Sequence, residues 1–97
     1  MFEKNKYTTK EINEKISPIH VMLMIELVHD MNVKRDYLQI FKLYIDSENK
    51  NLQIIEHSQE KPHYTRLHKF ITLNPVEAKI YVIDYGEYSV MMFADEY

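Results

Sequence analysis

Three histidines lie close together in the middle of the sequence, at His57, His63 and His68, and histidine clusters can bind transition metals. Two more, His20 and His29, fall on a predicted helix. His63 and His68 are separated by an odd number of positions, which places their side chains on opposite faces of a strand. We therefore expect surface histidines rather than a metal site, and we predict no cofactor.

Other catalytic arrangements are weakly represented. The chain has no cysteine nucleophile, and Ser58 directly follows His57, so that their side chains point to opposite faces of a strand. Phosphate-binding loops need several glycines, and Gly86 is the only glycine in the sequence. We predict that the protein is not an enzyme.

The segment KPHYTRLHKF, at 61–70, interleaves basic and aromatic residues, a combination typical of strands that bind single-stranded nucleic acid. Parity places all of the candidate residues except Lys69 on one face of the strand. The alternative is an outer strand that its charges keep soluble. The candidate nucleic-acid residues are Tyr64, Arg66, His68, Lys69 and Phe70.

One helix followed by about five strands must position these side chains. Ser17-Pro18 is typical of a helix start, and the apolar spacing predicts a helix from Pro18 to about residue 32. Strands are predicted at 36–45, 51–57 and 63–72, with two more in 78–94 and a short one in KYTTKEI. This order predicts an α+β fold, in which one N-terminal helix packs on a mostly antiparallel sheet.

The turn at DYGE sets the expected register of the last hairpin. We predict a three-residue loop at 84–86, because it needs a positive φ only at Gly86. A tip at 48–49 is predicted for the earlier hairpin. These registers give one apolar sheet face for the helix and a second face that is amphiphilic, which either residues 1–16 cover or a partner contacts. The predicted partner-binding residues on this second face are Tyr44, Ile55, Tyr81, Met91 and Phe93.

Composition sets the broad class. A chain of 97 residues with 45% hydrophobic residues is expected to form a single domain over 1–97. The net charge of −3 gives no overall attraction to nucleic acid. No apolar run is long enough to span a membrane, and MFEKNKYTTK lacks the apolar region of a signal peptide. We therefore expect a cytoplasmic protein that does not contact membranes.

Three segments, MFEKNKYTTKEINEKI, LQIIEHSQEKPHY and AKIYVIDYGEYSVMMFADEY, resemble the family known as domain of unknown function nine-sixty. These are small Firmicute proteins found in staphylococcal cassette chromosome elements and phages. The resemblance implies a mobile-element context, and it implies no activity, cofactor or catalytic residue.

We therefore predict a non-enzymatic accessory protein of a mobile genetic element, which acts by binding a host or element-encoded protein, by forming a homodimer, or both. The alternative is a single-stranded nucleic-acid-binding protein that uses the basic and aromatic strand at 61–70.

Overall fold

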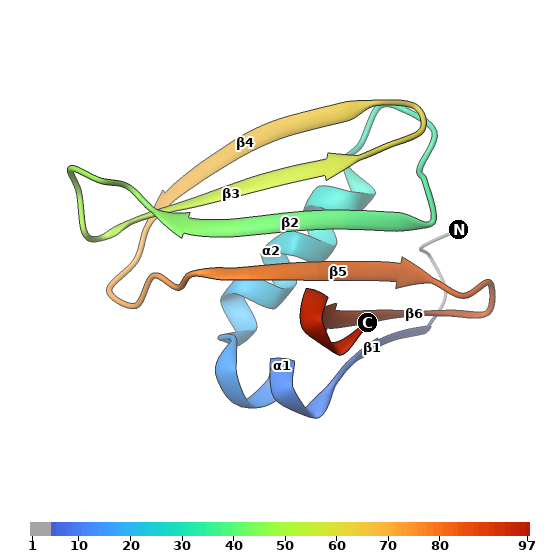
Figure 1. Cartoon of the computed structure of the whole chain (residues 1–97), viewed down its shortest axis with the longest axis horizontal. Coiled ribbons are helices and arrows are strands. Elements are labelled where there is room, and N and C mark those ends of the chain that lie inside the picture. The colour runs from blue at the N-terminus through green and yellow to red at the C-terminus, as the bar shows by residue number, and fades with distance from the viewer. Residues whose placement is uncertain (1–4) are drawn as a thin grey trace.

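A six-stranded sheet organises residues 5–97, which are the residues that this computed structural model describes (Figure 1). The strand order is β1-β6-β5-β2-β3-β4, with β1 parallel to β6 and every other pair antiparallel. The predicted α+β class is confirmed. A second short helix adds to the expected elements, and the short strand expected in KYTTKEI is the edge strand β1, which pairs in parallel with β6. The elements are β1 (Asn5–Thr8), α1 (Lys10–Lys15), α2 (Pro18–His29), β2 (Leu38–Ile45), β3 (Leu52–Gln59), β4 (Tyr64–Ile71), β5 (Ala78–Asp84), β6 (Tyr88–Phe93) and the 3-10 helix η1 (Ala94–Glu96).

Side-chain caps start both α-helices. The Ser17 hydroxyl accepts a hydrogen bond from the backbone N–H of His20 at 3.2 Å, and Pro18 occupies the first turn of α2, as predicted. The Thr9 hydroxyl accepts from the N–H of Ile12 at 3.3 Å and starts α1 in the same way. The caps satisfy N–H groups that have no partner within the helix.

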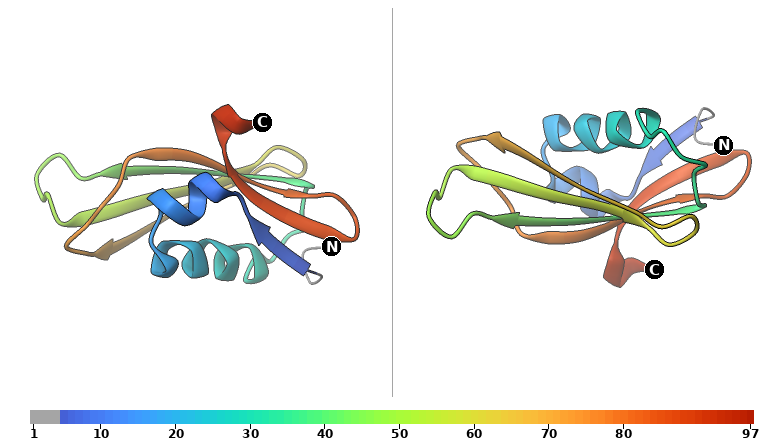
Figure 2. Two further views of the ribbon diagram at one scale, coloured as in Figure 1. Left: turned by 90° about the horizontal axis from the view of Figure 1, so that it is seen from below. Right: turned by 90° about the horizontal axis from the view of Figure 1, so that it is seen from above.

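Both helices lie on the same face of the sheet, and Figure 2 shows the C-terminal η1 on the opposite side. The hydrophobic core lies between the helices and the sheet, and Ile12 and Ile16 of α1 belong to it. The smallest dimension of the molecule, 21 Å, equals about one helix layer on one sheet layer. Residues 5–8 form the edge strand β1 and α1 packs on the helix side, so residues 5–16 do not form a layer on the second face, which contradicts the first of the two alternatives given for that face; residues 1–4 lie outside the described range.

The β2–β3 hairpin has a register one residue away from the predicted one. Ile45 pairs with Gln53, so the loop is longer than a two-residue tip at 48–49. The Asp46 carboxylate explains the longer loop, because it accepts hydrogen bonds from the backbone N–H groups of Glu48 and Asn49 at 2.9 and 3.0 Å. The shift moves Ile55 to the helix side, where it is fully buried.

The β5–β6 hairpin also differs from the predicted register. Tyr85 N donates to Tyr88 O at 2.9 Å, so Gly86 and Glu87 form the tip. Gly86 has a φ of 99°, and no other residue of the described chain has a positive φ, as expected. Glycine at the first tip position is typical of a type II′ turn, whereas the predicted loop at 84–86 had Gly86 at its last position. The change of parity places Met91 and Phe93 with Ile80 on the helix side.

We call the sheet face without α1 and α2 the open face. The registers place on it one alternate set of residues from each strand. The set carries large apolar side chains together with lysines, as predicted for the second face, but its members differ from the predicted ones. They are Asn5, Tyr7, Leu38, Ile40, Lys42, Tyr44, Leu52, Ile54, Glu56, Ser58, Thr65, Leu67, Lys69, Ile71, Lys79, Tyr81, Ile83, Tyr88, Val90 and Met92.

Candidate functional site

Only Tyr44 and Tyr81 of the predicted partner-binding residues lie on the open face. Ile55 and Met91 are core residues with 0% and 2% of their surface exposed, so the prediction that they share a face with Tyr81 is wrong. Phe93 is half-buried on the helix side, and its ring centroid lies 6.0 Å from Lys15 Nζ. The physical reason is the parity of the two hairpins, since a shift by an odd number of residues turns every side chain of a strand to the other face.

The open face exposes five large apolar side chains, and Tyr44 is the only one of them that was predicted. These come from both edges of the sheet as well as its middle, so the apolar surface extends across the strands. The signal in the sequence was present, because each is an apolar residue at an alternate strand position, but choosing the face required the correct registers. The residues and their exposed fractions are Tyr7 (55%), Tyr44 (36%), Leu67 (52%), Ile71 (66%) and Tyr88 (43%).

Tyrosine rings contact one another at the β1–β6 edge of the open face. The Tyr7 ring meets the edge of Tyr88 with centroids 5.9 Å apart, and Tyr85 stacks on Tyr88 at 5.4 Å. These rings hold each other in defined orientations while their surfaces stay exposed. Preordered aromatic rings lose little conformational entropy when a partner binds them.

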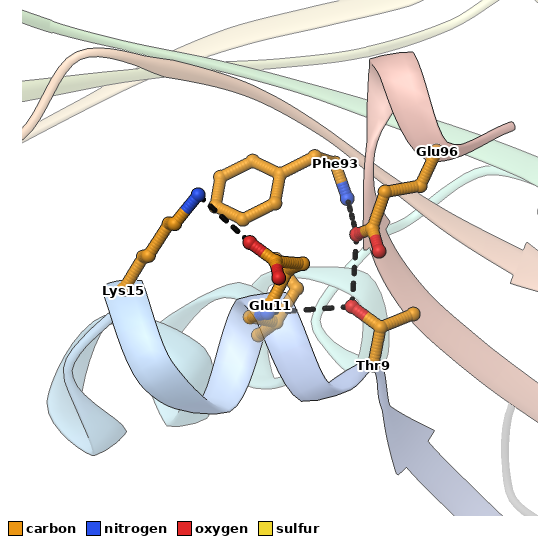
Figure 3. Close-up of polar contacts among 6 residues, drawn as sticks. Thr9, Glu11, Lys15, Phe93 and Glu96 are labelled. Carbon is orange, nitrogen blue, oxygen red and sulfur yellow. Dashed lines mark hydrogen bonds and ion pairs between the residues drawn. The ribbon is translucent and has the colours of Figure 1, made fainter.

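The C-terminal turn is fixed beside the open face by polar contacts to the start of α1 (Figure 3). The Glu96 carboxylate accepts hydrogen bonds from Thr9 Oγ1 and from Phe93 N, both at 2.9 Å. On the open face, the Tyr97 ring then meets the edge of Tyr81 with centroids 5.9 Å apart. Tyr81 is therefore half-buried by the chain itself.

The charges among the open-face strand residues are mostly positive. Lys42, Lys69 and Lys79 are exposed there, and Glu56 is the one acid of the set. Lys42 Nζ lies 3.9 Å from the Glu56 carboxylate, and Lys79 Nζ lies 5.8 Å from the Tyr81 ring centroid. The open-face strands therefore carry more lysines than acids, and the acids of η1, Asp95 and Glu96, lie on the same side of the sheet.

The candidate nucleic-acid residues divide between the two faces, as parity predicted. Tyr64, Arg66, His68 and Phe70 are on the helix side, and Lys69 is on the open face. The two aromatic rings are already occupied within the chain. Tyr64 packs against His57 and Phe70 packs against His20, each in a T-shaped arrangement with ring centroids 5.3 Å apart. Base stacking on these rings would require them to leave internal contacts.

Two buried glutamines and one buried histidine form a chain of hydrogen bonds on the helix side of the sheet. Gln59 Nε2 donates to the carbonyl oxygens of Lys34 and Pro62 at 2.9 and 2.8 Å, and Gln39 Nε2 donates to Gln59 Oε1 at 2.7 Å. These contacts leave Gln39 Oε1 to accept from His57 Nε2 at 2.7 Å. His57 therefore carries its proton on Nε2, which leaves Nδ1 as a buried acceptor without a hydrogen-bond partner.

His57 is held neutral by its surroundings. Burial is the largest cause and the nearby His68 the second, and together they lower the pKa of His57 from 6.5 to about 4. Its ring stacks on Phe41 with centroids 4.4 Å apart. Burial and then the Arg66 charge lower the pKa of His68 as well. Residues 5–97 contain no group of three or more side chains suited to hold a metal ion.

A second polar cluster joins α2 to the sheet, and sequence reasoning missed it. His20 Nε2 donates to Gln53 Oε1 at 3.0 Å, and Gln53 Nε2 donates to the carbonyl oxygens of Tyr44 and Val76 at 2.9 and 3.0 Å. Both His20 and Gln53 are buried. The available signal was the position of the polar residues, because Gln39 in β2 and Gln53 in β3 occupy the same alternate positions as the core residues of those strands. Both polar networks are internally bonded and offer structural support rather than reactive groups.

No helix among residues 5–97 is long and apolar enough to cross a membrane.

The fold is similar to the crystal structure of a protein of unknown function from Enterococcus faecalis, with a TM-score of 0.70 and 17% sequence identity. That similarity covers 100% of this chain and 98% of the other. No curated protein is significantly similar in sequence. A family model described as staphylococcal protein of unknown function (DUF960) matches residues 5–96, and the chain therefore belongs to that family.

Proposed function

We propose that this protein is a non-enzymatic protein-binding module whose partner docks on the open face. The observation that carries the proposal is the set of large apolar side chains exposed on one uncovered sheet face: Tyr7, Tyr44, Leu67, Ile71 and Tyr88. Extended apolar surfaces of this kind mark sites of association on soluble domains. Tyrosine is also enriched at the centres of protein interfaces.

The charges on this face favour an acidic partner protein over a second copy of the chain. Lys42 and Lys79 lie side by side on the central strands β2 and β5, Lys69 lies between Leu67 and Ile71 on β4, and Glu56 is already paired with Lys42. Two open faces brought together would place lysines of both copies in one interface, and like charges across an interface are costly. An acidic partner would gain from the same lysines. A homodimer through this face is thus the less favoured form of protein binding.

Binding of single-stranded nucleic acid is a second candidate function, because tyrosines and lysines share the open face, as they do on single-strand-binding sheets. The net charge of −3 opposes it, and the aromatic rings of the strand at 64–71 have internal partners. An accessory role in a mobile genetic element stays a prediction from the resemblance.

The first prediction tests the open face by substitution. A Tyr44→Ser/Tyr88→Ser variant should lose an acidic protein that the wild-type chain retains from a staphylococcal lysate treated with nuclease, because the variant removes two exposed rings from the interface. The measurement is affinity capture with quantitative mass spectrometry. The matched control is Ile19→Ser, which removes an apolar side chain of α2 that is 72% exposed. Circular dichroism should show both variants folded.

Two outcomes would contradict the proposal. One is equal retention of the protein by the tyrosine variant and the wild type. The other is capture of nucleic acid from an untreated lysate with no protein retained after nuclease treatment, which would favour the second candidate.

A further inference from the structure

Strand β4 forms one edge of the sheet, and no described element lies beside it (Figure 1). It is eight residues long and pairs with β3 along its whole length. Its other side carries a row of backbone groups without strand partners. Such an edge accepts an additional strand unless charges or bulges prevent it.

The register identifies which residues turn their backbone groups to the free edge. Thr72 N donates to Asn51 O at 2.8 Å, one position beyond β4 in its register with β3. Hydrogen-bonded and non-hydrogen-bonded pairs alternate along antiparallel strands, so even-numbered residues of β4 turn their N–H and C=O groups to β3. The odd-numbered residues turn theirs outward. These residues are Thr65, Leu67, Lys69 and Ile71.

The two sides of this edge differ in chemistry. On the open face, Leu67 and Ile71 are 52% and 66% exposed, and the exposed Lys69 lies between them. On the helix side, Arg66 is exposed and His68 lies next to it in the same row. The segment at 61–71 contains three basic residues, Lys61 among them, and no acid. An added strand with acids on its helix side, near Arg66, and apolar residues on its open side, opposite Leu67 and Ile71, would match these three residues. Lys69 would also favour an acidic partner.

The same charges oppose pairing of β4 with β4 of a second copy. Antiparallel self-pairing would bring Arg66 and Lys69 of both chains to one seam that contains no acid from β4. Basic residues on an edge strand protect against this kind of self-association. They do not protect against a strand of opposite charge.

We propose that the β4 edge binds an extended segment of an acidic partner protein, which adds to the sheet as an antiparallel strand with alternating acidic and apolar side chains. This rests on the proposed function, because it states how the partner of the open face is held. Backbone hydrogen bonds from the outward-facing residues of β4 supply affinity. Arg66 and Leu67 select acids on one side and apolar side chains on the other.

The test uses a fluorescent, end-blocked nine-residue peptide of alternating glutamate and valine, titrated with the full chain and followed by anisotropy. In the proposed pairing, the valine N–H groups face β4 and the glutamate N–H groups face solvent. Methylating three valine nitrogens should therefore weaken binding by about tenfold or more, whereas methylating three glutamate nitrogens should change it little. Equal effects of the two modifications would overturn the proposal.

A pair of protein variants tests the same edge from the other side. Leu67→Pro and Leu67→Ala lose the same apolar contact, but only proline removes the outward N–H. Leu67→Pro should bind the peptide about tenfold more weakly than Leu67→Ala. Equal affinities would count against strand addition, while loss of the natural partner by the Tyr44→Ser/Tyr88→Ser variant would still support the open face.

Two further outcomes would overturn the proposal. One is binding of a labelled oligodeoxythymidylate without binding of the glutamate–valine peptide, because the edge would then recognise phosphates. The other is a wild-type dimer that Leu67→Pro dissociates and Leu67→Ala does not, because β4 would then pair with itself.

Discussion

His57 is the residue whose protonation should affect stability most, because its pKa is lowered to about 4. Its neutral ring donates a hydrogen bond to Gln39 and stacks on Phe41. Nδ1 has no hydrogen-bond partner, so no neighbouring acceptor would stabilise a second proton there. Gln39, in turn, bonds to Gln59, which bonds to the loops before β2 and before β4. Protonation of His57 would thus place a charge in the interior, at one end of a hydrogen-bonded chain that joins β2, β3 and two loops.

The prediction for His57 is a loss of stability in mild acid. Its pKa is about 4 in the folded chain and 6.5 as the ordinary value, so between these values the unfolded chain binds more protons. The contribution of neutral His57 to the free energy of unfolding is fully present above pH 6.5. It is lost as the pH falls to about 4, and the total loss is roughly 3 kcal/mol. Urea unfolding at pH 7 and pH 4.5 measures it.

Two variants provide the comparison for that measurement. His57→Gln should be less stable at pH 7 but should show a smaller decrease between the two pH values. His63→Gln changes an exposed histidine and should behave as the wild type does. An unchanged pH dependence in His57→Gln would assign the acid sensitivity to other groups.

At the level of elements, Thr9 links the first helix to the last turn. Its hydroxyl accepts from Ile12 N and donates to the Glu96 carboxylate, so one side chain caps α1 and holds η1 (Figure 3). Thr9→Ala should lower the free energy of unfolding by about 1 kcal/mol, and the melting temperature by about 4–8 °C. Thermal unfolding followed by circular dichroism checks this. Thr9→Ser keeps the hydroxyl and should stay within about 2 °C of the wild type; an equal loss in both variants would mean that the methyl group matters more.

The elements also show what the sequence could predict. Ser17-Pro18 marked the start of α2, and alternation located the strands, because these signals are local. The registers were not predicted, since each depends on a turn: the Asp46 carboxylate lengthens one loop, and Gly86 occupies the first tip position of the other. His57 and His20 were expected at the surface but are buried, because buried polar residues look like surface residues until their partners are known.

For the molecule as a whole, the two faces of one sheet have different roles. The helix side contains the core and the buried polar networks, and the open face and the β4 edge form the proposed binding surface. Tyr44 and Tyr81 were predicted for this surface, but its remaining residues follow from the registers. The charges differ between the surfaces as well, because the strand residues of the open face include three lysines and one acid on a chain with a net charge of −3.

The prediction at this scale concerns self-association. The chain should be a monomer at low salt, because lysines on the open face and on β4 repel a second copy. Raising the salt from 50 to 500 mM shortens the screening length from about 14 to about 4 Å, which should promote weak dimerisation through the exposed apolar side chains. Sedimentation velocity at both concentrations tests this. A dimer that is stable at low salt and dissociates at high salt would contradict it.

The parallel pairing of β1 with β6 has a consequence for biosynthesis. Asn5 to Thr8 leave the ribosome early, yet their strand partners, Tyr88 to Met91, are synthesised more than eighty residues later. During translation the first strand must wait unpaired while the hairpins form behind it. The sheet therefore becomes complete only after β6 has left the ribosome and can pair with β1.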